Sequence, residues 1–163
     1  LLNRRAFFED ELPRRFKRLK RDGKSSALFY VDLDNFKQVN DIHGHQRGDE
    51  ALLAVRGLLE EHSRSGDVIA QHGGGEFAMW IEGVTQEVAA ERARMLNAAA
   101  RDLAEFSGNQ ENPLGLSIGV AIYEPESGER LDGLLARADA AMYAVKEAGK
   151  GSYKVAPPAP VKT

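Results

Sequence analysis

The apolar run at residues 25–32, with the sequence SSALFYVD, constrains the fold of this chain more than any other segment. It is rich in strand-forming residues and follows Gly23, which is the pattern of a buried strand bounded by a turn. The period of two along a strand places Leu28, Tyr30 and Asp32 on one face. We therefore predict a buried strand whose terminal carboxylate, that of Asp32, is directed off the end of a sheet.

Helical and strand patterns alternate along the chain in an order that predicts an α+β sandwich, with helices packed on a sheet. Apolar residues at helical or alternating spacing define these segments. Helices are expected at 3–20, 48–61, 85–104 and 130–148, and further strands at 68–70, 76–81, 114–123 and 152–155. Asn3 suits the N-cap of the first helix, and Pro13 must kink or interrupt that helix.

Three consecutive glycines, Gly73, Gly74 and Gly75, separate two of the expected strands. We interpret this pattern as a β-hairpin, because glycine readily supplies the positive φ that tight hairpin turns need. A glycine turn also allows the backbone to approach phosphates closely. The alternative is a tight turn with no functional role.

The length and charge of the chain limit the kinds of function it can have. A chain of 163 residues fits one domain, and a net charge of −3 argues against broad binding to nucleic acid or to an anionic membrane. The absence of cysteine excludes disulfides, thiolate nucleophiles and Cys–zinc sites. No apolar run approaches the roughly 18–20 residues of a membrane span, and no signal peptide is present.

The expected domain covers residues 1–155, and residues 156–163 form a proline-rich tail that we expect to be disordered. The sequence begins with Leu1 rather than methionine, which we interpret as a module cut from a longer protein. We expect a cytoplasmic location, either alone or as the cytoplasmic part of a larger protein.

The segment Asp32-Leu33-Asp34-Asn35-Phe36-Lys37 carries the strongest chemical signal. Carboxylates at a strand end, beside a basic residue and a following helix, suit a divalent ion and a phosphate. The alternative is that Asp32 and Asp34 only cap the next helix, and for an isolated pair of this kind the two readings have about equal weight.

A second polar segment runs from Asn40 to Asp49 and is expected to be a loop that enters a helix. The amide of Asn40 and the carboxylate of Asp49 together can read the edge of a guanine by donor and acceptor complementarity. Alternatively, Asn40 is a turn residue and Asp49 is a charge that complements the helix dipole.

These pieces occur in the order and spacing of a known family. DLDNFKQVNDIHGHQRGDEAL followed by DVIAQHGGGEF resembles the GGDEF (diguanylate cyclase) family, as do the opening LLNRRAF, the strand SIGVAIY and the helix ADAAMYAVKEAGKG. The resemblance runs from residue 1 to about residue 155, and several independent motifs carry it.

Members of this family condense two GTP molecules into cyclic di-GMP, each of two facing domains holding one GTP. The resemblance implies a palm-like, mostly antiparallel central sheet flanked by helices, as in nucleotidyl cyclases. It implies Mg²⁺ at Asp32 and the Leu33 carbonyl, and guanine recognition by Asn40 and Asp49. It assigns contacts with GTP to Asn35, Phe36, Lys37, Lys146 and Lys150.

The signature departs from the family at its third position, where Gly75 replaces an aspartate or glutamate. In the family that carboxylate helps to hold two magnesium ions. Losing several kcal/mol of transition-state stabilisation would slow the reaction by about a thousandfold. Glu76 is not expected to substitute, because neighbouring strand residues point to opposite faces. A second departure is Gln71, where an arginine is usual.

Another family feature is intact in this sequence. Arg64 and Asp67 form an RxxD motif, and in the family that motif at this position forms an inhibitory site that binds product cyclic di-GMP. Arginine can stack on guanine and bind phosphate through its planar fork. Arg92 matches a further basic contributor. The alternative is a solvated surface ion pair.

Three hypotheses follow from these features. The domain is a regulatory module that has lost cyclase activity and binds cyclic di-GMP, GTP or both; it is an active cyclase that tolerates Gly75; or it is an inert dimerisation or docking module. The first is favoured by Gly75 together with Arg64 and Asp67. The expected partners are GTP, cyclic di-GMP and either a second copy or covalently linked sensor domains.

Overall fold

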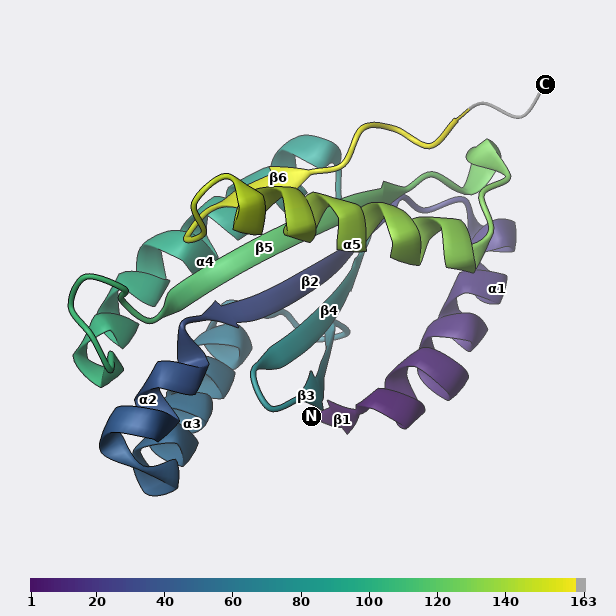
Figure 1. Cartoon of the computed structure of the whole chain (residues 1–163). Helices are drawn as coiled ribbons and strands as arrows, with labels where there is room; N and C mark the ends of the chain where they lie inside the picture. The colour runs from purple at the N-terminus through teal and green to yellow at the C-terminus, as the bar shows by residue number, and fades with distance from the viewer. Residues whose placement is uncertain (161–163) are drawn as a thin grey trace.

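The computed structural model describes residues 1–160, and its centre is a six-stranded sheet with helices on both faces (Figure 1). The strand order is β1-β3-β4-β2-β5-β6. The strands are β1 (Leu2–Asn3), β2 (Ser26–Asp34), β3 (Val68–Gly73), β4 (Glu76–Glu82), β5 (Gly115–Tyr123) and β6 (Tyr153–Val155). The three inner pairs are antiparallel and the two edge pairs are parallel. The expected α+β fold with a mostly antiparallel sheet is confirmed.

Helices cover each face of the sheet and bury a separate apolar cluster against it. The helices are η1 (Ala6–Glu11), α1 (Leu12–Asp22), α2 (Phe36–His43), α3 (His45–Glu61), α4 (Gln86–Ala99), η2 (Ala100–Phe106), η3 (Pro125–Ser127) and α5 (Leu131–Glu147). One cluster joins the sheet to α2, α3, α4 and η2, and the other joins it to η1, α1 and α5. The functional elements are therefore held on a sheet that is packed from both sides.

The alternation of β2 accounts for its central position. Phe29 and Val31 belong to the cluster beneath α3 and α4, whereas Leu28 and Tyr30 belong to the cluster beneath α1 and α5. Both faces of the strand are thus covered, as the apolar run predicted. Asp32 is on the same face as Leu28 and Tyr30, but it is not the end of the strand as expected: β2 continues to Asp34, and Asp32 pairs with Glu76 on one side and Ser117 on the other.

The first expected helix is not interrupted at Pro13: the helical backbone is continuous from η1 into α1, and only the change from π to α geometry, at Leu12, lies beside the proline. The Asn3 side chain accepts a hydrogen bond from the Ala6 amide at 2.8 Å, which confirms its capping role. The π-helix η1 then passes into α1, with Pro13 in the first turn of α1. The wider π turn, in which the Leu12 amide donates to the Phe7 carbonyl, lies directly before the proline, which has no backbone N–H to donate.

Two expectations about local structure were wrong. The segment 40–49 is not a polar loop: it contains the end of α2 and the start of α3, separated by Gly44 at φ 89°. The glycines of the hairpin also do not adopt positive φ. A Cβ would lie 2.9 Å from Oε2 of the flexible Glu76 side chain at Gly73 and 3.3 Å from Phe36 Cδ2 at Gly75, and it would meet nothing within 4 Å at Gly74, so neither positive φ nor a lack of space requires all three glycines.

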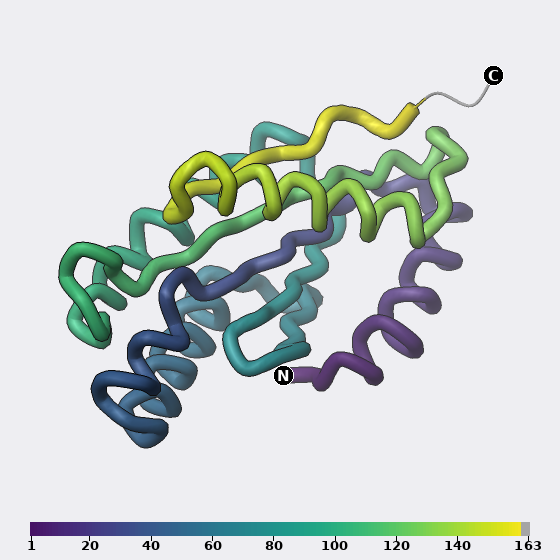
Figure 2. The backbone as a smooth tube through the Cα atoms, in the orientation of Figure 1, coloured from purple at the N-terminus to yellow at the C-terminus, as the bar shows by residue number. Residues whose placement is uncertain are grey.

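The two ends of the described chain lie at opposite edges of the sheet (Figure 2). β1 pairs with β3 beside the hairpin, whereas the chain after β6 runs along the other edge. Contacts continue past residue 155, since the Ala156 amide donates to the Val120 carbonyl and Arg137 donates to the Pro157 carbonyl. Part of the expected tail, residues 161–163, lies outside the described residues. No helix within residues 1–160 is long and apolar enough to cross a membrane.

Candidate functional site

A buried carboxylate organises the end of β2 where the site is expected. Asp34, whose side chain is 2% exposed, accepts hydrogen bonds from Ser117 Oγ at 2.6 Å, Lys146 Nζ at 2.7 Å and the Gly151 amide at 2.8 Å. Three donors compensate the desolvation of this charge. Asp34 therefore joins β2, β5, α5 and the loop after α5, a role that the sequence analysis did not assign to it.

Asp32 lies two residues earlier on the same face and remains partly accessible. Its Oδ2 is 3.1 Å from Lys146 Nζ, and its side chain is 25% exposed. Lys146 thus bridges the two carboxylates, one buried and one open to solvent. The ammonium group is therefore a neighbour of the Asp32 carboxylate, to which the resemblance assigns a divalent ion.

The residues assigned to the triphosphate gather where α2 begins. Lys150 Nζ donates to Asn35 Oδ1 at 3.0 Å, and Asn35 and Lys150 both have left-handed backbones, with φ of 63° and 69°. Phe36 and Lys37 open α2, and the Lys37 side chain is exposed. A groove of about 790 Å³ runs beside Asn35, Lys146 and Lys150, toward α4. A helix start with cations beside it suits an anion.

The structure also places Asn40 against the first turn of α3. A Cβ added at Gly48 would lie 1.8 Å from Asn40 Oδ1, so the amide fills the space that a side chain at residue 48 would need. Asp49, the next residue, is exposed. The two residues expected to read guanine therefore come from neighbouring helices that face each other.

Gly75 lies beside the backbone of the expected metal site. Its carbonyl accepts a hydrogen bond from the Leu33 amide at 2.9 Å. A Cβ at residue 75 would be 3.6 Å from Leu33 Cβ and 3.3 Å from Phe36 Cδ2. A side chain fits at residue 75 if the Phe36 ring moves by a few tenths of an ångström. The packing around residue 75 therefore leaves room for the carboxylate that the sequence lacks.

Glu76 is on the same sheet face as Asp32, because the two residues are paired directly in the β2–β4 register. Its carboxylate nevertheless turns toward β3, with Oε2 3.6 Å from His72 Nδ1. Burial lowers the pKa of His72, against the opposing effect of the Glu76 charge. Glu76 therefore faces His72 and Gly73 in this arrangement.

At the implied magnesium site the side chains supply one carboxylate, that of Asp32, and residue 75 supplies none. Within residues 1–160, no group of three or more histidine and acidic side chains is arranged to bind a metal ion. The implied magnesium site retains Asp32 and the Leu33 carbonyl but has no carboxylate at residue 75. We therefore assign no chemical step to a protein-held metal.

The RxxD segment forms a tight turn in front of β3. Asp67 Oδ2 accepts hydrogen bonds from the Arg64 amide at 2.8 Å and from Arg92 Nη1 at 3.0 Å. The side chains of Asp67 and Arg92 are 8% and 9% exposed, whereas Arg64 is exposed. The structure thus brings the three expected residues together, with Arg64 open to solvent.

Comparison with known proteins identifies the family. The protein-family model described as "Diguanylate cyclase, GGDEF domain" matches residues 1–152 of this sequence. The chain belongs to this family, whose proteins act in cyclic di-GMP signalling. The bifunctional diguanylate cyclase/cyclic di-GMP phosphodiesterase MucR of Pseudomonas aeruginosa is 36% identical over 152 residues, which are 93% of this chain and 22% of MucR.

Solved structures agree with this assignment. The GGDEF domain of DgcB from Caulobacter crescentus, in complex with c-di-GMP, aligns with a TM-score of 0.84 and 30% identity, covering 95% of this chain and 91% of that one. The active GGEEF domain of a diguanylate cyclase from Vibrio cholerae aligns with a TM-score of 0.83 and 27% identity, covering 98% and 99%. The chain spans 19–40% of the length of the curated relatives compared with it.

The different surroundings of the two aspartates predict different effects of mutation. Asp34→Asn leaves Lys146 and two neutral donors with a weaker acceptor, so it is expected to lower the free energy of unfolding by about 1–3 kcal/mol. The matched change Asp32→Asn removes a partly exposed ion pair and is expected to cost less than about 1 kcal/mol. Urea denaturation measures both values. Equal losses would show that Asp34 does not have the structural role described.

Proposed function

We propose that this domain is a regulatory module that binds GTP and cyclic di-GMP and has little or no diguanylate cyclase activity. The observation that carries the proposal is Gly75, which lies beside the Leu33 backbone where the family places a carboxylate. Lys146 already compensates part of the Asp32 charge. Without a second carboxylate, the site has little means to hold two magnesium ions against the triphosphate.

Binding of GTP is supported by the groups that the domain retains. Asn40 lies against Gly48 with Asp49 beside it, and Lys146 and Lys150 bind Asp34 and Asn35 where α2 begins. GTP would bring Mg²⁺ with its own phosphates, so we expect its affinity to depend less on magnesium than in a domain with the complete signature.

Binding of cyclic di-GMP is supported by the turn at residues 64–67. Arg64 is exposed and can supply charge, fork geometry and a stacking plane to a ligand with two phosphates and two guanines. The ion pair between Asp67 and Arg92 connects the turn to α4. The related domain from DgcB has been solved with c-di-GMP bound.

A second candidate function is an active cyclase. The direct register of Asp32 with Glu76 favours it, because a change of rotamer would direct Glu76 away from His72 and toward Asp32. The curated relatives include diguanylate cyclases. The experiment that follows separates this candidate from the regulatory module.

The variant Gly75→Asp is expected to raise the rate of cyclic di-GMP formation more than tenfold over the wild type, up to about a thousandfold, because it restores the second carboxylate. The control is Gly74→Asp, which adds the same charge one residue away, where a Cβ meets nothing within 4 Å. Chromatography of reactions with GTP and Mg²⁺ measures all three proteins. Wild-type turnover within tenfold of Gly75→Asp, with product formed by both, would favour the active cyclase instead.

A second variant tests the product site. Arg64→Ala is expected to weaken cyclic di-GMP binding about tenfold to a hundredfold, because it removes a charge-assisted contact at an exposed position. Arg56→Ala, which removes an exposed arginine on α3, is the control and is expected to bind as the wild type does. Isothermal titration calorimetry decides between the outcomes. Equal affinity of Arg64→Ala and wild type, or no binding by wild type at tens of micromolar ligand, would overturn the effector role.

A further inference from the structure

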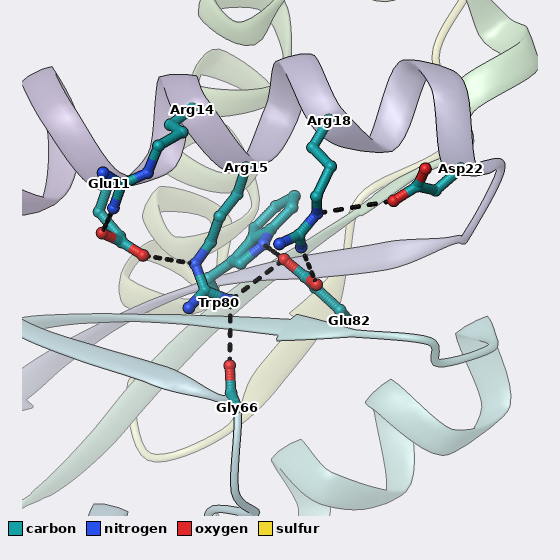
Figure 3. A network of polar contacts seen from close by, with 8 residues as sticks. All are labelled: Glu11, Arg14, Arg15, Arg18, Asp22, Gly66, Trp80 and Glu82. Carbon is teal, nitrogen blue, oxygen red and sulfur yellow. Dashed lines mark hydrogen bonds and ion pairs between the residues drawn. The ribbon is translucent and has the colours of Figure 1, made fainter.

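Arg15 reaches from α1 across 51 residues of sequence to the turn that carries the RxxD motif (Figure 3). Its Nη1 donates a hydrogen bond to the Gly66 carbonyl at 3.1 Å. Gly66 lies between Arg64 and Asp67 in the sequence. The N-terminal helix and the proposed cyclic di-GMP turn are therefore in direct contact through one side chain.

The guanidinium of Arg15 is itself held in place. Nε donates to Glu11 Oε1 at 2.7 Å, and Nη1 also lies 3.2 Å from Glu82 Oε2. Glu82 accepts a further bond from Trp80 Nε1 at 2.9 Å, which anchors the carboxylate to the sheet. Burial opposes the charge, yet the hydrogen bonds to Glu11 and Glu82 raise the pKa of Arg15 above its ordinary value. The guanidinium that donates to the Gly66 carbonyl is therefore held in position by the carboxylates of Glu11 and Glu82.

The contact acts on one peptide unit of the turn. The Asp67 amide donates to the Arg64 carbonyl at 3.0 Å, and the Gly66 carbonyl of the same peptide unit accepts from Arg15. Gly66 has a φ of 96°, where a glycine has few steric restraints of its own. Both ends of this peptide unit are therefore fixed by hydrogen bonds, and only one of those bonds comes from outside the turn.

We propose that Arg15 is a positioning residue of the cyclic di-GMP site, which fixes the 66–67 peptide and thereby the direction in which Arg64 leaves the turn. The proposal rests on the proposed function, because it assumes that this turn binds the ligand. It makes the affinity for product depend on the position of α1. By linkage, product binding stabilises α1 in the position that it has here.

Arg15→Met and Arg18→Met form a matched pair to test this proposal. Both remove an arginine of α1 that binds Glu82, but Arg18 has no hydrogen bond or ion pair with residues 63–68 in the described chain. Amide hydrogen exchange in the ligand-free protein reports on the turn, and calorimetry reports on cyclic di-GMP affinity. Both are measured where each variant is fully folded, as checked by urea denaturation.

Arg15→Met is expected to speed exchange of the Asp67 amide and to weaken cyclic di-GMP binding, each about tenfold. Arg18→Met is expected to change each less than twofold. Unchanged exchange at Asp67 in Arg15→Met, or faster exchange with unchanged affinity, overturns the proposal. If wild type binds no cyclic di-GMP, the proposed effector function fails, and so does the role of Arg15 in binding, whereas exchange still tests its hold on the turn. Equal effects of the two variants would show a general loss of the Glu82 contact and would also overturn it.

Discussion

The buried carboxylate of Asp34 is the constraint on which the geometry of the candidate GTP site depends. A charge that is 2% exposed must be fully compensated, and here its donors come from β5, from α5 and from the loop that follows α5. These bonds place Lys146 next to Asp32 and Gly151 next to the end of β2. Asp34 therefore fixes the positions of the cations beside the accessible Asp32 carboxylate, although a bound ligand need not contact Asp34 itself.

The two proposed sites lie at opposite ends of one strand, so a substitution in one is separated from the contacts of the other. Asp67 immediately precedes β3, whereas Gly75 follows its far end, across the hairpin. In the part of the chain that the structure describes, side chains of Arg92 and Arg15 bind the turn at 64–67, and the hairpin tip makes no hydrogen bond with it. Substitution at residue 75 therefore leaves the restraints of the product turn in place.

Local patterns predicted the parts of the structure that depend on local physics. The strand at 25–32 and the cap at Asn3 follow from periodicity and side-chain chemistry, and the structure confirms both. The helical conformation of residues 40–43 and 45–49 was missed, because this polar segment has little apolar periodicity and its two helices meet at the backbone of Gly44. The Arg15–Gly66 contact could not be predicted, since the fold alone brings those residues together. The roles of Asp32, Asn40 and Asp49 in GTP binding stay predictions.

Backbone amide resonances of the wild-type domain, recorded with cyclic di-GMP and separately with GTP and Mg²⁺, test the central claim most directly. We expect cyclic di-GMP to shift the amides of 64–67 and Arg92, GTP to shift those of 35–49 and 146–151, and little or no cyclic di-GMP to form from GTP over hours. Absence of shifts at 64–67 with cyclic di-GMP, or conversion of most of the GTP to cyclic di-GMP during the measurement, would contradict the claim.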